Sequence, residues 1–450
     1  MSLSSFDTGG RARDRFLRDP LGLVLLFCGT LLLGYGDTAS LNSPIRIPPL
    51  EAWQGGVFGG IEVLCLAMVV IAALRRAASR NRSWTPNRLD MPVFLIAIVL
   101  AVYPFVHLLL VEGGFRIPYE ANFVPFFVVM YLVWRLTFEP GDMRLMIGMF
   151  FAAGLYKCVE GILVFLTNDA LWGALTGWRD GMLLTLGVAG GLLALAIRPD
   201  KDDWYAVVRR HFLLALPLFA IVFVLAMRRS YMVAFVATIP FVLYRLQAGA
   251  ERRRLWRSLV LVSPVFVLGA LFFGFDAVGA RFTSILVPTG EGSAAWRLIE
   301  YYNVANMIAE RPFTGWPWGV EFVNATGIDL PTISTLTPHN IYLYALLRGG
   351  LIGLFCWLWL LVRQYKMSVS AIRHARSAGE RFVGIWMMIA LLLVVFSGLT
   401  SPVLASRLTI LLPFLMVFVG FLPGANASRT SNWRPQSQVS GTTTLPSGAA

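Results

Sequence analysis

The sequence predicts an all-α polytopic membrane protein with about 12 transmembrane helices and one main loop outside the cytoplasm. Of its 450 residues, 57% are hydrophobic and 14% are charged, and the mean hydropathy is +0.68. A soluble chain of this length would need more polar surface to cover its core. Apolar runs of about 20 residues, the length that a helix needs to cross a bilayer, recur along the chain. The sequence does not show the short segments of alternating hydrophobicity that are typical of a membrane β-barrel.

The predicted spans follow these apolar runs in order. They lie at residues 20–36, 56–75, 91–111, 118–136, 143–166, 181–198, 212–228, 230–246, 257–275, 338–362, 382–399 and 402–422. Only Arg228, Arg229 and Ser230 interrupt the seventh and eighth runs. Read as one helix, residues 212–246 would be about 52 Å long, too long for a single crossing. We therefore predict a tight hairpin of two short spans.

The net charge of +13 is explained by topology rather than by a nucleic-acid partner. If both termini are cytoplasmic, most of the 38 Lys and Arg residues fall on the cytoplasmic side, as the positive-inside rule requires. The clusters that set this bias lie at residues 11–18, 75–88, 198–210, 245–257 and 363–381. We therefore expect no nucleic-acid binding and a cytoplasmic position for both ends of the chain.

These spans divide the chain into four regions. We predict transmembrane helices 1–9 at residues 1–275, an external loop at 276–337, transmembrane helices 10–12 at 338–423 and a disordered cytoplasmic tail at 424–450. The tail is rich in Ser, Thr, Gly and Pro. The four cysteines fall within apolar runs, which indicates small buried side chains rather than disulfides or metal ligands.

Some basic residues oppose the charge bias and need another explanation. Arg228 and Arg229 cap the predicted hairpin on the outer side. They could reach outward to lipid phosphates or form a planar fork that binds a phosphate or diphosphate. Arg179, which opens the sixth span beside Asp180, could be part of an ordinary interfacial pair.

Two charged residues lie inside the fifth predicted span. Lys157 and Glu160 are three positions apart and so share a helix face. Ionisable residues inside a membrane are costly and usually face a polar cavity or each other. The pair is either a structural ion pair or part of a substrate cavity.

His339 is the strongest single candidate for chemistry. It stands in Thr-Pro-His-Asn at residues 337–340, where the long loop re-enters the membrane. A helix start that follows a proline holds such a residue near exposed backbone N–H groups. Arg297 and the Pro-Phe-Thr-Gly turn at residues 312–315 belong to the same loop.

The segment that begins at Pro338 resembles the signature of the O-antigen ligase superfamily. It reads Pro-His-Asn-Ile-Tyr-Leu-Tyr-Ala-Leu-Leu-Arg-Gly-Gly-Leu-Ile-Gly at residues 338–353. The family shows a His-Asn pair, then leucines and a spaced Gly-x-x-Gly, near the end of one main periplasmic loop. The resemblance extends to Trp296-Arg297, to residues 311–315 and to Arg229-Ser230, and covers roughly residues 175–400.

This resemblance implies a glycosyltransferase in the bacterial inner membrane. A glycan would move from undecaprenyl diphosphate to an acceptor sugar such as lipid A-core at the periplasmic face, without metal or other cofactor. His339 would be the functional histidine, and Arg229 and Arg297 would bind the diphosphate. Arg179 would correspond to a further basic position of the family. Arg228 precedes the usual arginine, so the resemblance leaves open which of the two binds phosphate.

The residue types suit this chemistry. Arginines can hold the charge that develops on a diphosphate leaving group. A neutral histidine can take the proton of the acceptor hydroxyl, and direct displacement at the anomeric carbon would invert its configuration. Asn340, beside the histidine, and the Lys157–Glu160 pair are candidates for the lining of the substrate cavity.

Two alternatives remain open at this point. A polymerase of the same superfamily would extend an O-antigen or exopolysaccharide chain on its lipid carrier, and the His-Asn segment does not distinguish it from a ligase. A transporter of the same lipid-linked glycan would need charged cavities through both leaflets. The unexplained basic residues gather on one side, which favours an enzyme.

The predicted orientation can be tested with topology reporters. A reporter fused after Gly290 should report the periplasm, and the same reporter fused after Gly379 should report the cytoplasm, because the predicted tenth span separates them. The readout is the ratio of alkaline phosphatase activity to green fluorescence at each fusion point. Equal ratios at the two sites would contradict the predicted topology.

Overall fold

The computed structural model describes residues 20–35, 60–78, 87–112, 124–167, 181–200, 204–226, 229–246, 249–273, 292–318, 320, 338–399, 408–422 and 425. Within these ranges every regular element is a helix. In chain order they are α2 (Pro20–Tyr35), α4 (Gly60–Ala78), α5 (Asp90–Ile96), the π-helix η1 (Ala97–Val102), α6 (Tyr103–Glu112), α7 (Val124–Thr137), the 3₁₀-helix η3 (Pro140–Asp142), α8 (Met143–Thr167), α10 (Gly181–Ala196), α11 (Tyr205–Ala226), α12 (Arg229–Arg245), α13 (Ala250–Phe273), α15 (Gly292–Glu310), α16 (Ile341–Arg373), α17 (Ala378–Ser397) and α18 (Leu408–Phe421).

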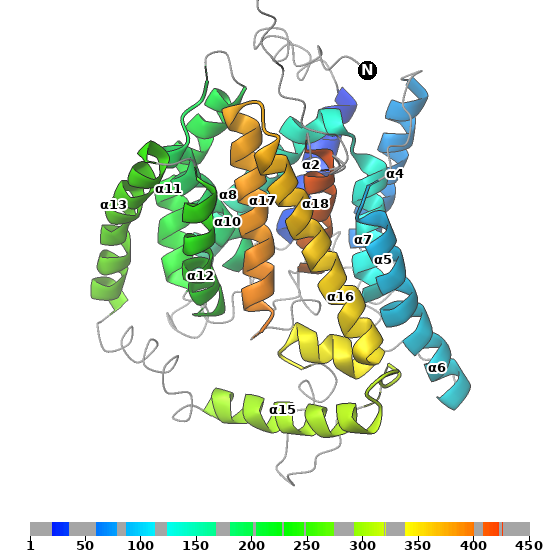
Figure 1. The fold of residues 1–450 in the computed structure, drawn as a ribbon. Helices are drawn as coiled ribbons and strands as arrows, with labels where there is room; N and C mark the ends of the chain where they lie inside the picture. Colours follow the sequence, from blue (N-terminus) through cyan, green and yellow to red (C-terminus); the bar gives the residue numbers. More distant parts are fainter. Residues whose placement is uncertain are drawn as a thin grey trace, which may run out of the picture.

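Most of these helices stand side by side in a bundle, and α15 lies across one end of it (Figure 1). We call this end, where α15 and the start of α16 meet, the α15 end. Among the described residues, five stretches are long and apolar enough to cross a membrane, and six shorter apolar helices of 10–17 residues accompany them. The prediction of an all-α protein with several membrane spans is confirmed over the described residues. The count of 12 crossings stays a prediction.

The predicted hairpin between the seventh and eighth spans is present as a helix break. Helix α11 ends at Ala226 and α12 begins at Arg229. The rings of Phe223 and Phe235 lie 6.2 Å apart, centroid to centroid. In one continuous helix these residues would be about 18 Å apart along the axis. The chain therefore reverses direction here.

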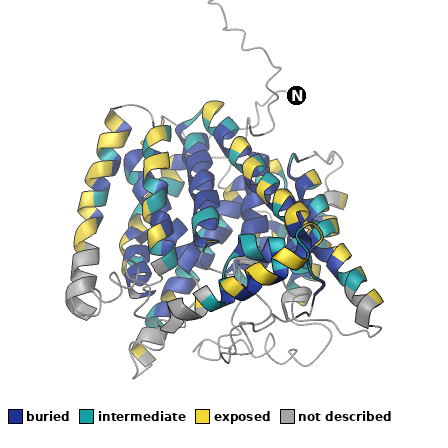
Figure 2. Ribbon diagram, turned by 60° about the horizontal axis from the view of Figure 1, so that its bottom comes forward, coloured by how far each residue is buried: buried dark blue, intermediate teal, exposed yellow. Residues whose placement is uncertain are grey.

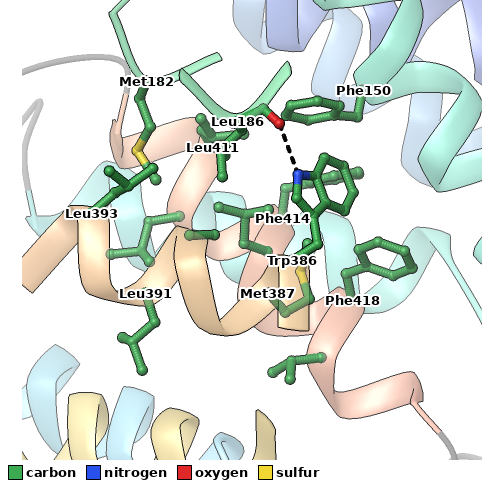
Figure 3. Close-up of a cluster of buried hydrophobic side chains, with 14 of the residues drawn as sticks. Phe150, Met182, Leu186, Trp386, Met387, Leu391, Leu393, Leu411, Phe414 and Phe418 are labelled. Atoms are coloured by element: carbon green, nitrogen blue, oxygen red, sulfur yellow. Dashed lines mark hydrogen bonds between the residues drawn. The ribbon is translucent and has the colours of Figure 1, made fainter. Parts of the chain in front are cut away.

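The core of the bundle is built around the indole of Trp386 on α17, which is fully buried. Its Nε1 donates a hydrogen bond to the carbonyl oxygen of Leu186 on α10, at 2.9 Å (Figure 3). The ring of Phe150 on α8 packs edge-on against it at 4.5 Å, and Phe418 on α18 contacts it from a fourth helix. Indole rings bury a large apolar surface while their N–H still finds a partner. The dark blue interior in Figure 2 shows how far this core extends.

Ion pairs join neighbouring helices at the end of the bundle opposite α15. Arg75 pairs with Asp142 at 3.1 Å, and Arg381 pairs with Glu251 at 2.5 Å. These contacts connect α4 to η3 and α17 to α13. This end carries many of the basic residues that the sequence analysis assigned to the cytoplasm.

Helix α16 corrects the predicted tenth span at residues 338–362. The helix begins at Ile341 and continues to Arg373, and Gly350 interrupts it with φ 58° and ψ −157°. In Figure 1 the part before this break turns toward α15, whereas the part after it runs through the bundle. The predicted span was taken as one straight helix from residue 338 to residue 362, whereas the helix bends at Gly350 and continues to Arg373. The sequence analysis also foresaw no helix in the external loop, where α15 lies.

Gly350 should be the position in α16 that tolerates substitution least. Its backbone conformation is open essentially to glycine alone, and a Cβ would fall 2.2 Å from the carbonyl carbon and oxygen of Phe313. Gly350→Ala should lower the free energy of unfolding by roughly 2–5 kcal/mol. The measurement is the thermal unfolding of the purified protein in detergent. Gly249→Ala is the control, because that glycine also has a positive φ but has no atom within 4 Å of the added Cβ. Equal losses in the two variants would rule out the clash with Phe313.

Candidate active site

Helix α15 carries a buried face that includes charged and polar residues. Glu300, Asn303, Val304 and Met307 are buried, at the spacing of one helix face. Val304 and Met307 pack against Leu347 of α16 in a small cluster separate from the main core. The opposite face of α15 is exposed, as the yellow residues in Figure 2 show. α15 is thus an amphipathic helix whose buried face lies on the start of α16.

The side chain of Glu300 contacts His339 with both carboxylate oxygens. Its Oε1 accepts the backbone N–H of His339 at 2.5 Å, and its Oε2 lies 2.7 Å from the ring nitrogen Nδ1. The carboxylate is 3% exposed and the histidine side chain is 41% exposed. An ionised carboxylate can only accept a hydrogen bond, so this contact favours the ring form that has its proton on Nδ1. In that form the free lone pair is on Nε2.

Asn340 caps α16 rather than pointing into open space. Its Oδ1 accepts the backbone N–H groups of Tyr342 at 2.9 Å and Leu343 at 3.2 Å. Its Nδ2 donates to the carbonyl oxygen of Leu399, beyond the end of α17, at 3.2 Å. Asparagine at this position satisfies helix N–H groups that would otherwise lack partners. The amide that the sequence analysis offered as cavity lining is therefore engaged in holding the helix start that follows His339.

The Pro-Phe-Thr-Gly turn that was noted in the sequence packs directly on the break in α16. The backbone N–H of Trp316 donates to the carbonyl oxygen of Leu347 at 2.6 Å, and that of Leu351 donates to the carbonyl oxygen of Pro312 at 2.8 Å. Gly315 has φ 69°, and a Cβ there would fall 2.7 Å from the carbonyl oxygen of Leu347. The turn and the break are thus fitted to each other by backbone contact.

Two arginines lie in or beside the segment that joins α15 to α16. The guanidinium of Arg348 is fully buried and donates to the carbonyl oxygens of Pro317 at 2.7 Å and Val320 at 3.1 Å. Arg311 lies 4.2 Å from the ring centroid of Trp316. Both arginines therefore stabilise the segment between α15 and α16.

Arg297 lies exposed on α15, one turn before Glu300. Its charge acts on the neighbouring Tyr301 hydroxyl, so Arg297 lies near that group. Burial raises the pKa of the Tyr301 hydroxyl above its ordinary value, a hydrogen bond with Asn340 lowers it, the charge of Glu300 raises it, and the charge of Arg297 lowers it. The Tyr301 hydroxyl also donates to the carbonyl oxygen of Leu399 at 3.1 Å. The structure thus gathers Arg297, Glu300, Tyr301, His339 and Asn340 in one place.

The other predicted diphosphate-binding residues are only partly described. Arg228 and Arg179 lie outside the described residues. Arg229 is the first residue of α12. At the last residue of this helix, the guanidinium of Arg245 donates to the Tyr365 hydroxyl at 3.0 Å, well past the break in α16. The start of α12 therefore points toward the α15 end, where His339 lies.

The start of α10 lies beside the start of α12. A Cβ added at Gly181, the first residue of α10, would fall 2.2 Å from the ring of Tyr231. Tyr231 stands two residues after Arg229 in the sequence. The first residues of α10 and α12 are thus neighbours. The sequence analysis had placed Arg179 just before the first of these helices and Arg229 at the start of the second.

Lys157 and Glu160 form a fully buried ion pair on α8. Their side chains are 0% and 1% exposed, and Lys157 Nζ donates directly to Glu160 Oε2. Helix α8 packs on α2, α10 and α11, whereas α15 packs on α16. Of the two interpretations left open by the sequence, this placement favours the structural ion pair.

Glu300 and Tyr301 are the site residues that sequence reasoning missed. That reasoning searched the loop for histidine and basic residues, and it predicted no helix there. The sequence does contain a signal for Glu300, because this acidic residue falls on the apolar face of a segment with helical periodicity. Glu300 precedes Val304 by four positions and Met307 by seven.

Comparison with known families places the site within a matched segment. Residues 212–358 match the family described as O-antigen ligase. This segment runs from α11 through the break in α16 and contains Arg229, Arg297, Glu300 and His339. The predicted resemblance is confirmed by this match. No curated protein matches the chain.

The ion pair on α8 can be tested by removing one charge or both. Lys157→Met should lower the free energy of unfolding by roughly 3–5 kcal/mol, because the buried carboxylate of Glu160 would lose the positive charge that compensates it. The double variant Lys157→Met/Glu160→Leu should recover most of that loss and should keep transfer activity. Thermal unfolding and a transfer assay on the same preparations check both points. A double variant that is stable but inactive would show that the pair takes part in substrate binding.

Proposed function

We propose that this protein transfers a glycan from undecaprenyl diphosphate to the sugar of a lipid A-core acceptor, a function supported by the match of residues 212–358 to the O-antigen ligase family. In this proposal the reaction takes place at the α15 end, which faces the periplasm, and inverts the anomeric carbon. The opposite end, with basic residues such as Arg75 and Arg381, would face the cytoplasm.

The observation that carries the proposal is the environment of His339. Its Nδ1 is committed to Glu300, and its ring remains 41% exposed. An imidazole held in this way offers Nε2 as a general base to a substrate that approaches from outside. Arg297 is exposed on α15, one turn before Glu300, and brings a positive charge to the same end of the protein.

The proposed reaction is a single displacement. Nε2 of His339 takes the proton of the acceptor hydroxyl while the hydroxyl oxygen forms a bond to the anomeric carbon. The bond between this carbon and the diphosphate oxygen breaks, and its electron pair leaves with the lipid diphosphate. Arg297 and Arg229 would hold that negative charge, because planar guanidinium groups can contact two phosphate oxygens at once.

A polymerase of the same superfamily, which would extend the glycan on its lipid carrier, is the alternative to a ligase. Deletion of the gene in its host distinguishes the two. In a ligase mutant the lipid A-core would carry no O-antigen at all. Core bearing a single repeat unit would instead assign the protein as a polymerase.

His339→Gln tests the proposed general base. Glutamine keeps a polar side chain of similar size but cannot take up a proton, so kcat should fall about 10²–10⁴-fold. Affinity for the lipid-linked donor should change little, because the proposed diphosphate contacts come from arginines. The assay is transfer by purified protein from a lipid diphosphate-linked glycan.

His374→Gln is the matched control. This histidine is also exposed and stands at the far end of the same helix, α16. Its variant should transfer at the native rate. Native kcat in His339→Gln would mean that the proton leaves through another group.

A further inference from the structure

Glu300 has a pattern of contacts that helix packing alone does not require. The residue is 2% exposed, and both of its oxygens contact the same neighbour, His339. One oxygen holds the backbone N–H and the other holds Nδ1 of the ring. A single side chain thus fixes both the main chain and the ring orientation of one residue.

The charge of this side chain calls for an explanation. A neutral glutamine could accept the same backbone N–H, and burying a carboxylate is costly unless it has a charged or strongly donating partner. The partner present here is an imidazole, which becomes positive whenever it takes up a proton. A buried carboxylate at 2.7 Å from Nδ1 would stabilise this protonated ring.

We propose that Glu300 is a positioning residue that holds His339 with its proton on Nδ1, so that Nε2 stays available to take the proton of the acceptor hydroxyl. This inference rests on the proposed function. Glu300 itself does not meet the substrate, because its carboxylate is 3% exposed behind the histidine. It acts only through His339.

The same contact serves two stages of the proposed reaction. Before transfer it selects the tautomer whose free lone pair lies on Nε2. As the proton moves to Nε2, the ring becomes a cation, and the carboxylate of Glu300 balances its charge. The proton then passes from Nε2 to water, which returns the ring to the starting tautomer.

The tautomer can be measured independently of any transfer assay. In protein labelled with ¹⁵N only in histidine, the signals of His339 are those that disappear in His339→Gln. At a pH where the ring is neutral, native protein should show Nδ1 protonated and Nε2 unprotonated. Glu300→Gln should show a mixture, or the opposite tautomer, because an amide can donate to Nδ1 as well as accept from it. An unchanged tautomer in Glu300→Gln would overturn the proposal.

Kinetics supply the second measurement. Glu300→Gln should lower kcat by about 10²-fold or more, in the range seen when a histidine base loses its orienting carboxylate, and should change KM less than about threefold. Glu300→Asp keeps the charge and should recover part of the rate. The control is Glu310→Gln, an exposed glutamate on the same helix, which should behave as native protein.

The outcomes separate this inference from the proposed function. Native kcat in Glu300→Gln together with a slow His339→Gln would overturn the positioning role and leave the proposed function standing. If native protein transfers no glycan but the tautomer responds to Glu300→Gln, the proposed function fails and the positioning role stands. The unfolding temperature of each variant is measured beside its activity, so that a general loss of folding is recognised.

Discussion

A close backbone contact between the turn at residues 313–315 and the break in α16 holds the α15 end together. At Gly350 and Gly315, a Cβ would fall within 2.2 Å and 2.7 Å of backbone atoms of the other segment. The break turns the first part of α16 toward α15, and this brings His339 against Glu300 (Figure 1). The candidate site thus depends on packing between two backbones at some distance from the histidine.

Buried charges in this protein have close polar partners, and the kind of partner separates structure from chemistry. Lys157 and Glu160 neutralise each other within one helix, and Arg348 donates to backbone carbonyls. In both arrangements the partner is a neighbouring group that is itself buried or part of the backbone. Glu300 differs because its partner is a titratable ring that is itself exposed. An exposed imidazole with a buried carboxylate partner is the arrangement on which we base the proposed general base.

Much of the fold and part of the site could be predicted from the sequence. The apolar runs were found because length and hydropathy are local properties, and the hairpin at Arg229 followed from the reach of one helix. His339 could be singled out because histidines are few and this one stands at a helix start. The kink at Gly350 was missed, since a glycine pair within an apolar run does not reveal which backbone will pack against it.

By itself, the sequence determined the helical class and the approximate positions of the helices, and it singled out His339 as a candidate for chemistry. Each of these depends on residues that lie within one helix or one turn of each other. Only the tertiary structure decided that Glu300 is the partner of His339 and that the Asn340 amide also donates to the carbonyl oxygen of Leu399. Glu300 and His339 are 39 positions apart, and Asn340 and Leu399 are 59 apart. No local periodicity encodes such contacts, because they arise when α15, α16 and α17 pack against one another.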